Sequence, residues 1–220
     1  MIIRAALAAI RDVLSPGFRR ILLKALGLTL LLFVAVMLLV QGLIAVFASF
    51  PWPWLDTVVA WLAGIGLLAA FLLLMAPVTA LFAGLFLDDV AELVERQDYP
   101  DDPPGRPADL FTSLRMGVEV FLLMIGVFIL VIPLWFLAIG PVIMVLANAW
   151  LLSREFFVMV AMRHMPLQAA RALRRRHAKR IWLAGLVPAL LSHVPLVNLF
   201  VPLFATAYFV HVYKSLARRG

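Results

Sequence analysis

Cysteine is missing from all 220 residues of the chain. Its absence excludes disulfide bonds, thiolate metal sites and cysteine nucleophiles. Charged residues are scarce as well, because they make up 14% of the chain, whereas soluble globular domains carry about 25%. So few charged side chains cannot cover the surface of a water-soluble fold. The composition therefore excludes a soluble domain and predicts an all-α integral membrane protein.

Hydrophobic residues make up 65% of the chain, and the longest uncharged stretches give its expected organisation. The first stretch covers residues 25–51 and the second covers residues 57–87. A membrane-spanning helix needs about 20 apolar residues, so each stretch is predicted to cross the bilayer once. Trp52 and Trp54 lie between the two stretches and Trp61 lies near the start of the second. An interfacial belt of aromatic residues is expected at this end of the two helices.

Two further uncharged stretches cover residues 120–153 and 181–213. Each is too long for one crossing and too short for two, which would need about 40 residues with a turn. Proline near the middle, at Pro133 in the first stretch and over Pro188–Pro202 in the second, removes a helical hydrogen bond. We therefore expect two re-entrant helical hairpins that penetrate the membrane partially and return to the same side. Broken backbone at their tips is tolerated only where protein or water covers it.

Basic residues cluster in residues 4–24, 163–180 and 214–219. Two spans and two re-entrant hairpins place all three clusters on one face, which the positive-inside rule makes cytoplasmic. Six full spans would do the same, so the depth of the hairpins stays open. The loop 88–119 falls on this face too, with a solvated linker at 97–105. Anionic lipids account for the net charge of +7, and no nucleic-acid partner is expected.

The chain is predicted to form a single membrane domain over residues 1–220, and residues 1–24 open it with an interfacial helix and an anion-site motif. Ile3, Leu7, Ile10 and Leu14 recur at helical spacing, which fits a helix lying in the membrane interface. The arginines inside this apolar pattern argue against a cleavable signal peptide. The basic stretch 163–180 is predicted to be a cytoplasmic helix that binds anionic lipid headgroups or gathers an anionic solute.

The motif that begins at Ser15 has the chemistry of an anion site. Ser15 is a good helix N-cap and Pro16 suits the first turn. The free N–H groups and positive dipole of that helix end would meet Arg19 and Arg20, and both kinds of donor suit a tetrahedral oxyanion. Gly17 would let the anion approach the backbone. Alternatively, the two arginines only anchor the helix on the cytoplasmic side.

Acidic residues follow the second uncharged stretch, and Asp88, Glu92 and Glu95 share one helix face. This face could pair with Arg115 or with the arginines at 171–180, or it could line a pathway. A solvated helix end is the alternative. No histidine follows these acids at ligand spacing, so no metal site is expected.

No sequence pattern indicates an enzyme. Gly-rich phosphate loops and Ser/His/Asp arrangements are absent, so we expect no catalytic residue and no cofactor. A membrane-embedded hydrolase would have to use Ser192, His193 and Asn198, and we disfavour it. The remaining alternatives are an anion permease and a non-transporting scaffold or regulator that binds anionic lipids.

Several short segments, in this order along the chain, resemble the CysZ family of bacterial sulfate permeases. They are Pro16–Arg20, Ala91–Glu95, Ala149–Trp150, Ala172–Arg174 and Val194–Phe200 with Pro202. The resemblance implies a multi-pass protein of the bacterial inner membrane with two long spans and two partially penetrating hairpins. It further implies a homo-oligomer, either a dimer or a multiple of dimers.

The resemblance also implies a function and a site. The function is sulfate uptake for cysteine biosynthesis, with sulfite as a second candidate substrate. The family's sulfate site carries over to Gly17, Phe18, Arg19 and Arg20. The acidic, proline-rich insertion at 97–109 is less typical of the family.

Overall fold

A computed structural model describes residues 1–47, 54–55, 57–59, 61–69, 86–107, 109–131, 140–194 and 197–218. Within these ranges every regular element is a helix and there is no strand, which confirms the predicted all-α class. By length and composition, Pro16–Leu43 and Gly140–Met162 could each cross a bilayer. The composition and these two helices together support a membrane protein.

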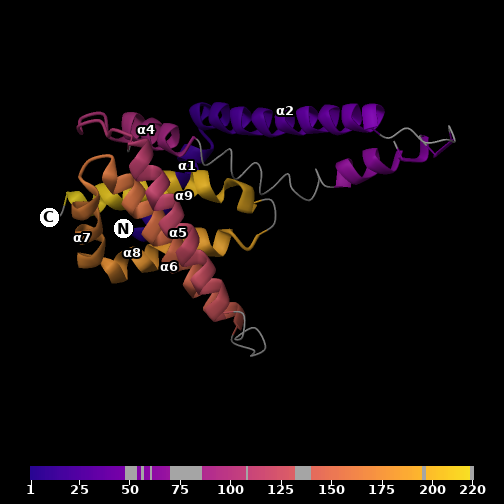
Figure 1. The fold of residues 1–220 in the computed structure, drawn as a ribbon. Coiled ribbons are helices and arrows are strands. Elements are labelled where there is room, and N and C mark those ends of the chain that lie inside the picture. The colour runs from indigo at the N-terminus through magenta and orange to yellow at the C-terminus, as the bar shows by residue number, and fades with distance from the viewer. Residues whose placement is uncertain are drawn as a thin grey trace.

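The helices gather into one cluster from which the longest helix projects. In chain order they are α1 (Ile2–Val13), α2 (Pro16–Phe47), α4 (Leu87–Asp98), α5 (Leu110–Val131), α6 (Gly140–Met162), α7 (Leu167–Arg176), α8 (Ala178–Leu191), the 3-10 helix η2 (Val197–Phe200) and α9 (Val201–Ala217). Figure 1 shows α1, α4 and α6 to α9 close together, while α2 extends away from them.

Helix α1 has the two faces that its sequence predicts. Ala5 and Ala9 are buried, and α1 packs against α9. The apolar residues of the predicted stripe point outward instead: Ile3, Leu7, Ile10 and Leu14 are 49–75% exposed. A row of exposed apolar side chains on a short helix suits the membrane interface. The helix ends at Val13, so residues 16–24 of the predicted N-terminal segment belong to α2.

Helix α2 begins where the sequence predicts. The Phe18 N–H donates to Ser15 Oγ at 3.3 Å, which confirms Ser15 as the N-cap. Gln41 and the residues near it lie against the helical segment 61–68, so the two predicted spans are neighbours where both are described. Residues 70–85 of the second predicted span lie outside the described residues.

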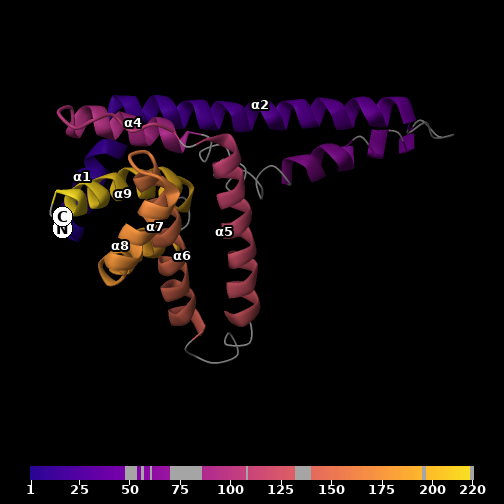
Figure 2. The ribbon, with the colours of Figure 1, turned by 60° about the vertical axis from the view of Figure 1, so that its left-hand side comes forward.

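Both predicted hairpin stretches form pairs of contacting helices. Helices α5 and α6 lie side by side in Figure 2, and α8 contacts α9. Helix α6 continues to Met162, beyond the predicted end at residue 153. Pro188 lies inside α8, and the chain turns after Leu191, within the stretch 188–202 where the break is predicted. Pro133 and Pro195 lie outside the described residues. How deeply these hairpins enter a membrane stays a prediction.

Helices α6 and α8 make the most extensive contact between two described helices. Gly185 of α8 lies directly against α6. A Cβ atom there would overlap the backbone oxygen of Ala149 and would lie 2.7 Å from Ser153 Cβ. Small residues let two helix backbones approach closely in membranes, so this contact needs glycine.

The predicted loop 88–119 is mostly helical. Helix α4 occupies its first part and α5 begins at Leu110, so the irregular residues that the structure describes are 99–107 and 109. The linker 97–105 is mostly exposed, as predicted, but the Gly105 N–H donates to Glu95 Oε2 at 3.1 Å. Its proline-rich part therefore folds over the end of α4.

Candidate functional site

The four residues of the predicted sulfate motif have different surroundings at the start of α2. Phe18 is buried in the core, whereas Arg19 and Arg20 are exposed. Neither arginine makes an ion pair with any residue in the described ranges. A buried Phe18 fixes the rotation of the first turn, and the two guanidinium groups beside it stay available to an anion.

Gly17 has a packing reason to be glycine. A Cβ atom at this position would lie 2.8 Å from Leu93 Cδ1 of α4. The predicted reason, close approach of an anion, stays a prediction. The contact with Leu93 instead brings the start of α2 against α4.

The acidic face of α4 is held by a basic residue that follows α6. Arg163 Nη1 donates to Asp88 Oδ1 at 2.6 Å, and Arg163 Nε donates to Glu95 Oε1 at 3.3 Å. His164 Nε2 lies 2.9 Å from the same Glu95 oxygen. Glu95 is almost fully buried, and these donors together with Gly105 N–H surround its carboxylate.

This arrangement corrects the predicted pairing. Glu92 pairs with Arg96 of its own helix, and Arg115 is exposed without an ion pair among the described residues. The partner of Glu95 and Asp88 is Arg163, and not Arg115 or the arginines at 171–180. Through Glu95 and Asp88 the acidic face makes an ion-paired contact with the segment after α6, while the side chains of Asp88 and Glu92 stay 48% and 46% exposed.

Two opposing effects set the pKa of Glu95. Burial raises it, but hydrogen bonds from His164 and Arg163 and the charge of Arg163 outweigh burial and lower the pKa to about 2. The carboxylate therefore stays charged at any physiological pH and holds α4 to the segment after α6.

Acid should loosen this contact. A carboxyl group with a lowered pKa stabilises the fold above its ordinary value of 4.5, and that stability is lost as the pH falls from 4.5 through about 2. The full loss would be about 3 kcal/mol, because one pKa unit corresponds to about 1.4 kcal/mol. Melting temperatures in detergent at pH 7, 5, 4 and 3 would measure the part of this loss that occurs above pH 3, about 2 kcal/mol. The Glu95→Gln variant should show a flatter profile, whereas Glu92→Gln should follow the wild type. Identical profiles for Glu95→Gln and wild type would contradict this role.

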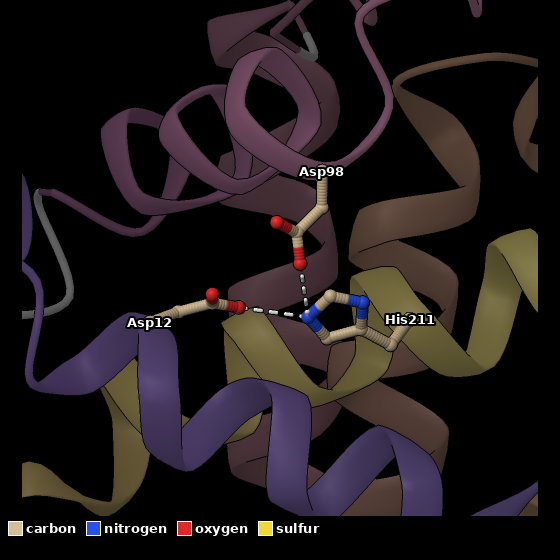
Figure 3. A group of neighbouring side chains, drawn as sticks. All are labelled: Asp12, Asp98 and His211. Carbon is tan, nitrogen blue, oxygen red and sulfur yellow. Dashed lines mark hydrogen bonds and ion pairs between the residues drawn. The ribbon is translucent and has the colours of Figure 1, made fainter.

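A second buried network joins α1, α4 and α9, as Figure 3 shows. His211 Nε2 lies 2.7 Å from Asp12 Oδ2 and 3.7 Å from Asp98 Oδ2. Tyr99 Oη lies 2.9 Å from the other ring nitrogen of His211. Arg11 donates to both Asp98 oxygens at 2.7 Å. The network ties the first and last described helices together through α4.

The same three residues, Asp12, Asp98 and His211, have ligand atoms close enough to hold a metal ion. However, these ligand atoms already contact other side chains. The two carboxylates face the same nitrogen of His211, and Arg11 neutralises Asp98. The arrangement can hold the helices together without an ion, and we assign it that structural role.

A pocket of about 120 Å³ lies between α5, α6 and α7. Its lining is rich in guanidinium groups: Met116, Glu119, Arg154, Glu155, Val158, Arg171, Arg174 and Arg175. Glu119 pairs with Arg154 from α6 and, at 2.5 Å, with Arg171 from α7. The carboxylate of Glu119 thus joins the three helices.

The sequence did not single out this pocket. Its one detectable signal is the spacing of Arg171, Arg174 and Arg175, which places them on one face of α7. Glu119 is the last acid before the third uncharged stretch, and nothing in its neighbourhood along the chain names its partners. Only the packing of α5 against α6 and α7 brings these groups together.

The disfavoured hydrolase group forms local hydrogen bonds at the end of α8. Ser192 Oγ accepts from Asn148 Nδ2 at 2.9 Å and donates to the Ala189 carbonyl at 2.7 Å. His193 Nδ1 lies 2.7 Å from the same carbonyl. Asn198 is exposed. These contacts cap a helix and give no sign of catalytic chemistry.

Comparison with known families finds a match. The family model described as Sulfate transporter CysZ/Etoposide-induced protein 2.4 matches residues 5–202. None of the curated proteins matches the chain significantly. The matched range includes the start of α2, the ion-paired face of α4 and the arginine-rich pocket.

Proposed function

The chain belongs to the Sulfate transporter CysZ/Etoposide-induced protein 2.4 family, and from that premise we propose that it is a sulfate permease of the bacterial inner membrane. In this proposal it takes up sulfate for cysteine biosynthesis, with sulfite as a second candidate substrate. A transporter family is not an enzyme class, so we assign no catalytic step.

The proposed architecture has two full crossings and two re-entrant hairpins. The crossings are α2 and the stretch 57–87, and the hairpins are α5–α6 and α8–α9. Figure 2 shows α6 running across the direction of α2 and not alongside it, so α6 is not a second crossing parallel to α2. Irregular tips within the membrane need cover from protein or water. We therefore propose a homo-oligomer, a dimer or a multiple of dimers, in which neighbouring subunits supply that cover.

The observation that carries the proposed function is the exposed pair of arginines at the capped start of α2. Phe18 N–H already donates to Ser15 Oγ, and Arg19 N–H donates to the Ser15 carbonyl. Proline has no N–H, so Gly17 N–H is the amide left for an anion at this helix end. Sulfate is therefore held mainly by the guanidinium groups of Arg19 and Arg20, with the helix dipole and Gly17 N–H adding to them.

Removing both arginines should weaken sulfate binding by about tenfold or more, because a hydrogen bond to a charged group contributes about 1.5–3 kcal/mol. The measurement is binding and uptake of labelled sulfate by protein reconstituted alone in liposomes, for wild type and for an Arg19→Ala, Arg20→Ala double variant. An Arg4→Ala, Lys24→Ala double variant is the matched control, because it removes two exposed charges from the same segment. It should keep wild-type binding.

Two results would contradict this proposal at different levels. Wild-type flux in the Arg19/Arg20 double variant would make these arginines simple anchors and would place the site elsewhere. No sulfate flux through the wild type would favour the scaffold or regulator. One observation keeps that second candidate open: Arg175, Arg176, Lys179 and Arg180 are exposed, as a surface that contacts anionic lipids requires.

A further inference from the structure

The pocket between α5, α6 and α7 is separate from the start of α2 and has room for a small ligand. Its volume is about 120 Å³, whereas one water needs about 10–15 Å³ by the same kind of measure. Its walls come from three helices, so it is not a feature of one helix end. The space is therefore large enough for a tetrahedral ion with some of its water.

The lining of this pocket is not neutral. It carries the guanidinium groups of four arginines and the carboxylates of Glu119 and Glu155. Glu119 is shared by Arg154 and Arg171, while Arg174 and Arg175 have no acidic partner among the residues that the structure describes. Even with both carboxylates ionised, two positive charges lack a counter-ion. A doubly charged anion would balance them.

Arg174 gives the most direct sign of a ligand. Its Nε atom is buried and has no hydrogen-bond partner in the described part of the chain. A buried donor that stays unpaired costs free energy, so such atoms are rare in folded proteins. Burial, and next the positive charges of Arg154, Arg175 and Arg171, lower the pKa of Arg174. An acceptor with negative charge in the pocket would satisfy the donor and relieve the repulsion.

We propose that this pocket binds a tetrahedral oxyanion through Arg174 and the neighbouring guanidinium groups. The planar, forked donors of arginine match sulfate and phosphate oxygens. The ion would be either free sulfate or phosphate, or the phosphate of a lipid headgroup that enters from the membrane surface. This site does not depend on the proposed transport function or on Arg19 and Arg20.

The test uses the full-length protein with the Arg19→Ala, Arg20→Ala background, so that the other candidate site is removed. Equilibrium dialysis in a neutral detergent would measure binding of labelled sulfate and of inorganic phosphate. Adding Arg174→Gln should lower the affinity by about tenfold or more, and Arg174→Lys should restore it in part because the charge returns without the fork. Arg106→Gln is the control, since Arg106 is an exposed arginine outside both the pocket lining and the basic surface of α7 and α8.

A second substitution, which should raise the affinity instead of lowering it, keeps the test independent of folding. Glu155→Gln removes a negative charge from the lining and should raise the affinity for the anion severalfold. Misfolding can lower the affinity for the anion but cannot raise it. Comparing Arg174→Gln with Glu155→Gln therefore separates an effect of charge from an effect of stability. Melting temperatures of all variants would be measured in parallel.

A second arm separates the two sources of the ion. Native mass spectrometry would measure retention of phosphatidylglycerol against zwitterionic phosphatidylcholine by the same variants. Binding of free sulfate or phosphate that depends on Arg174 supports a solute site. Retention of the anionic lipid alone, again dependent on Arg174, supports a headgroup site. If Arg174→Gln behaves like Arg106→Gln in both arms, the proposal is overturned, whatever the flux measurements show for sulfate transport.

Discussion

Replacing Arg163 with methionine should destabilise the protein by about 3–5 kcal/mol, the range found when one partner of a buried ion pair is removed. The Arg163 side chain is 2% exposed and that of Glu95 is 5% exposed. Without Arg163, the Glu95 carboxylate would stay buried with only His164 and the Gly105 N–H as donors. The ion pair with Asp88 would be lost as well.

Thermal melting of the purified protein in detergent would measure this effect. Arg106→Met is the matched control, because Arg106 is exposed and only its backbone N–H contacts Arg163, at the carbonyl oxygen. A second change, Glu95→Leu in the Arg163→Met protein, should recover part of the stability because it removes the unpaired charge. If Arg163→Met melts at the same temperature as Arg106→Met, the ion pair does not stabilise the fold.

Replacing Gly185 with alanine should cost about 3 kcal/mol, at the upper end of the range for overpacked cores. The new Cβ atom would meet the backbone oxygen of Ala149 and the Cβ atom of Ser153. Neither atom can rotate away, so α6 and α8 would have to separate. A loss of stability is the opposite of the usual effect of this substitution, because alanine normally stabilises a helix interior by about 1 kcal/mol relative to glycine.

Gly126 of α5 provides the control for this substitution. A Cβ atom there would meet nothing within 4 Å, so Gly126→Ala should leave the melting temperature unchanged or raise it slightly. Both variants would be compared with wild type in the same detergent. Equal melting temperatures for Gly185→Ala and Gly126→Ala would show that the α6–α8 contact tolerates a wider spacing.

The sequence predicted the features that depend on neighbouring residues. Ser15 and Pro16 define a helix start by local hydrogen bonding and backbone restriction, and the structure places the start of α2 there. The exposed stripe on α1 follows from helical spacing alone. The four uncharged stretches coincide with the described parts of the long helices, because an apolar run of about 20 residues or more has the length of a membrane helix.

The sequence could not name partners that only packing brings together. Many arginines could satisfy the acidic face of α4, and the choice of Arg163 over Arg115 depends on where α6 ends against α4. Glu119 offers no local hint of its two arginines for the same reason. The prolines show a related limit: they restrict the second hairpin's turn to residues 188–202, but only the structure shows that α8 continues past Pro188 to Leu191.

The contact between α1 and α9 has a consequence for how the protein is made. Asp12 and its partner His211 are 199 residues apart, and a ribosome adds about 5–20 residues per second. After Asp12 is synthesised, roughly 10–40 s pass before His211 exists. During this time α1 lacks the helix that covers Ala5 and Ala9. The exposed apolar side of α1 would hold it at the membrane surface in the meantime. Helix α9, the last described helix, therefore completes the burial of α1, and a nascent chain that stops before His211 would leave Asp12 without its partner.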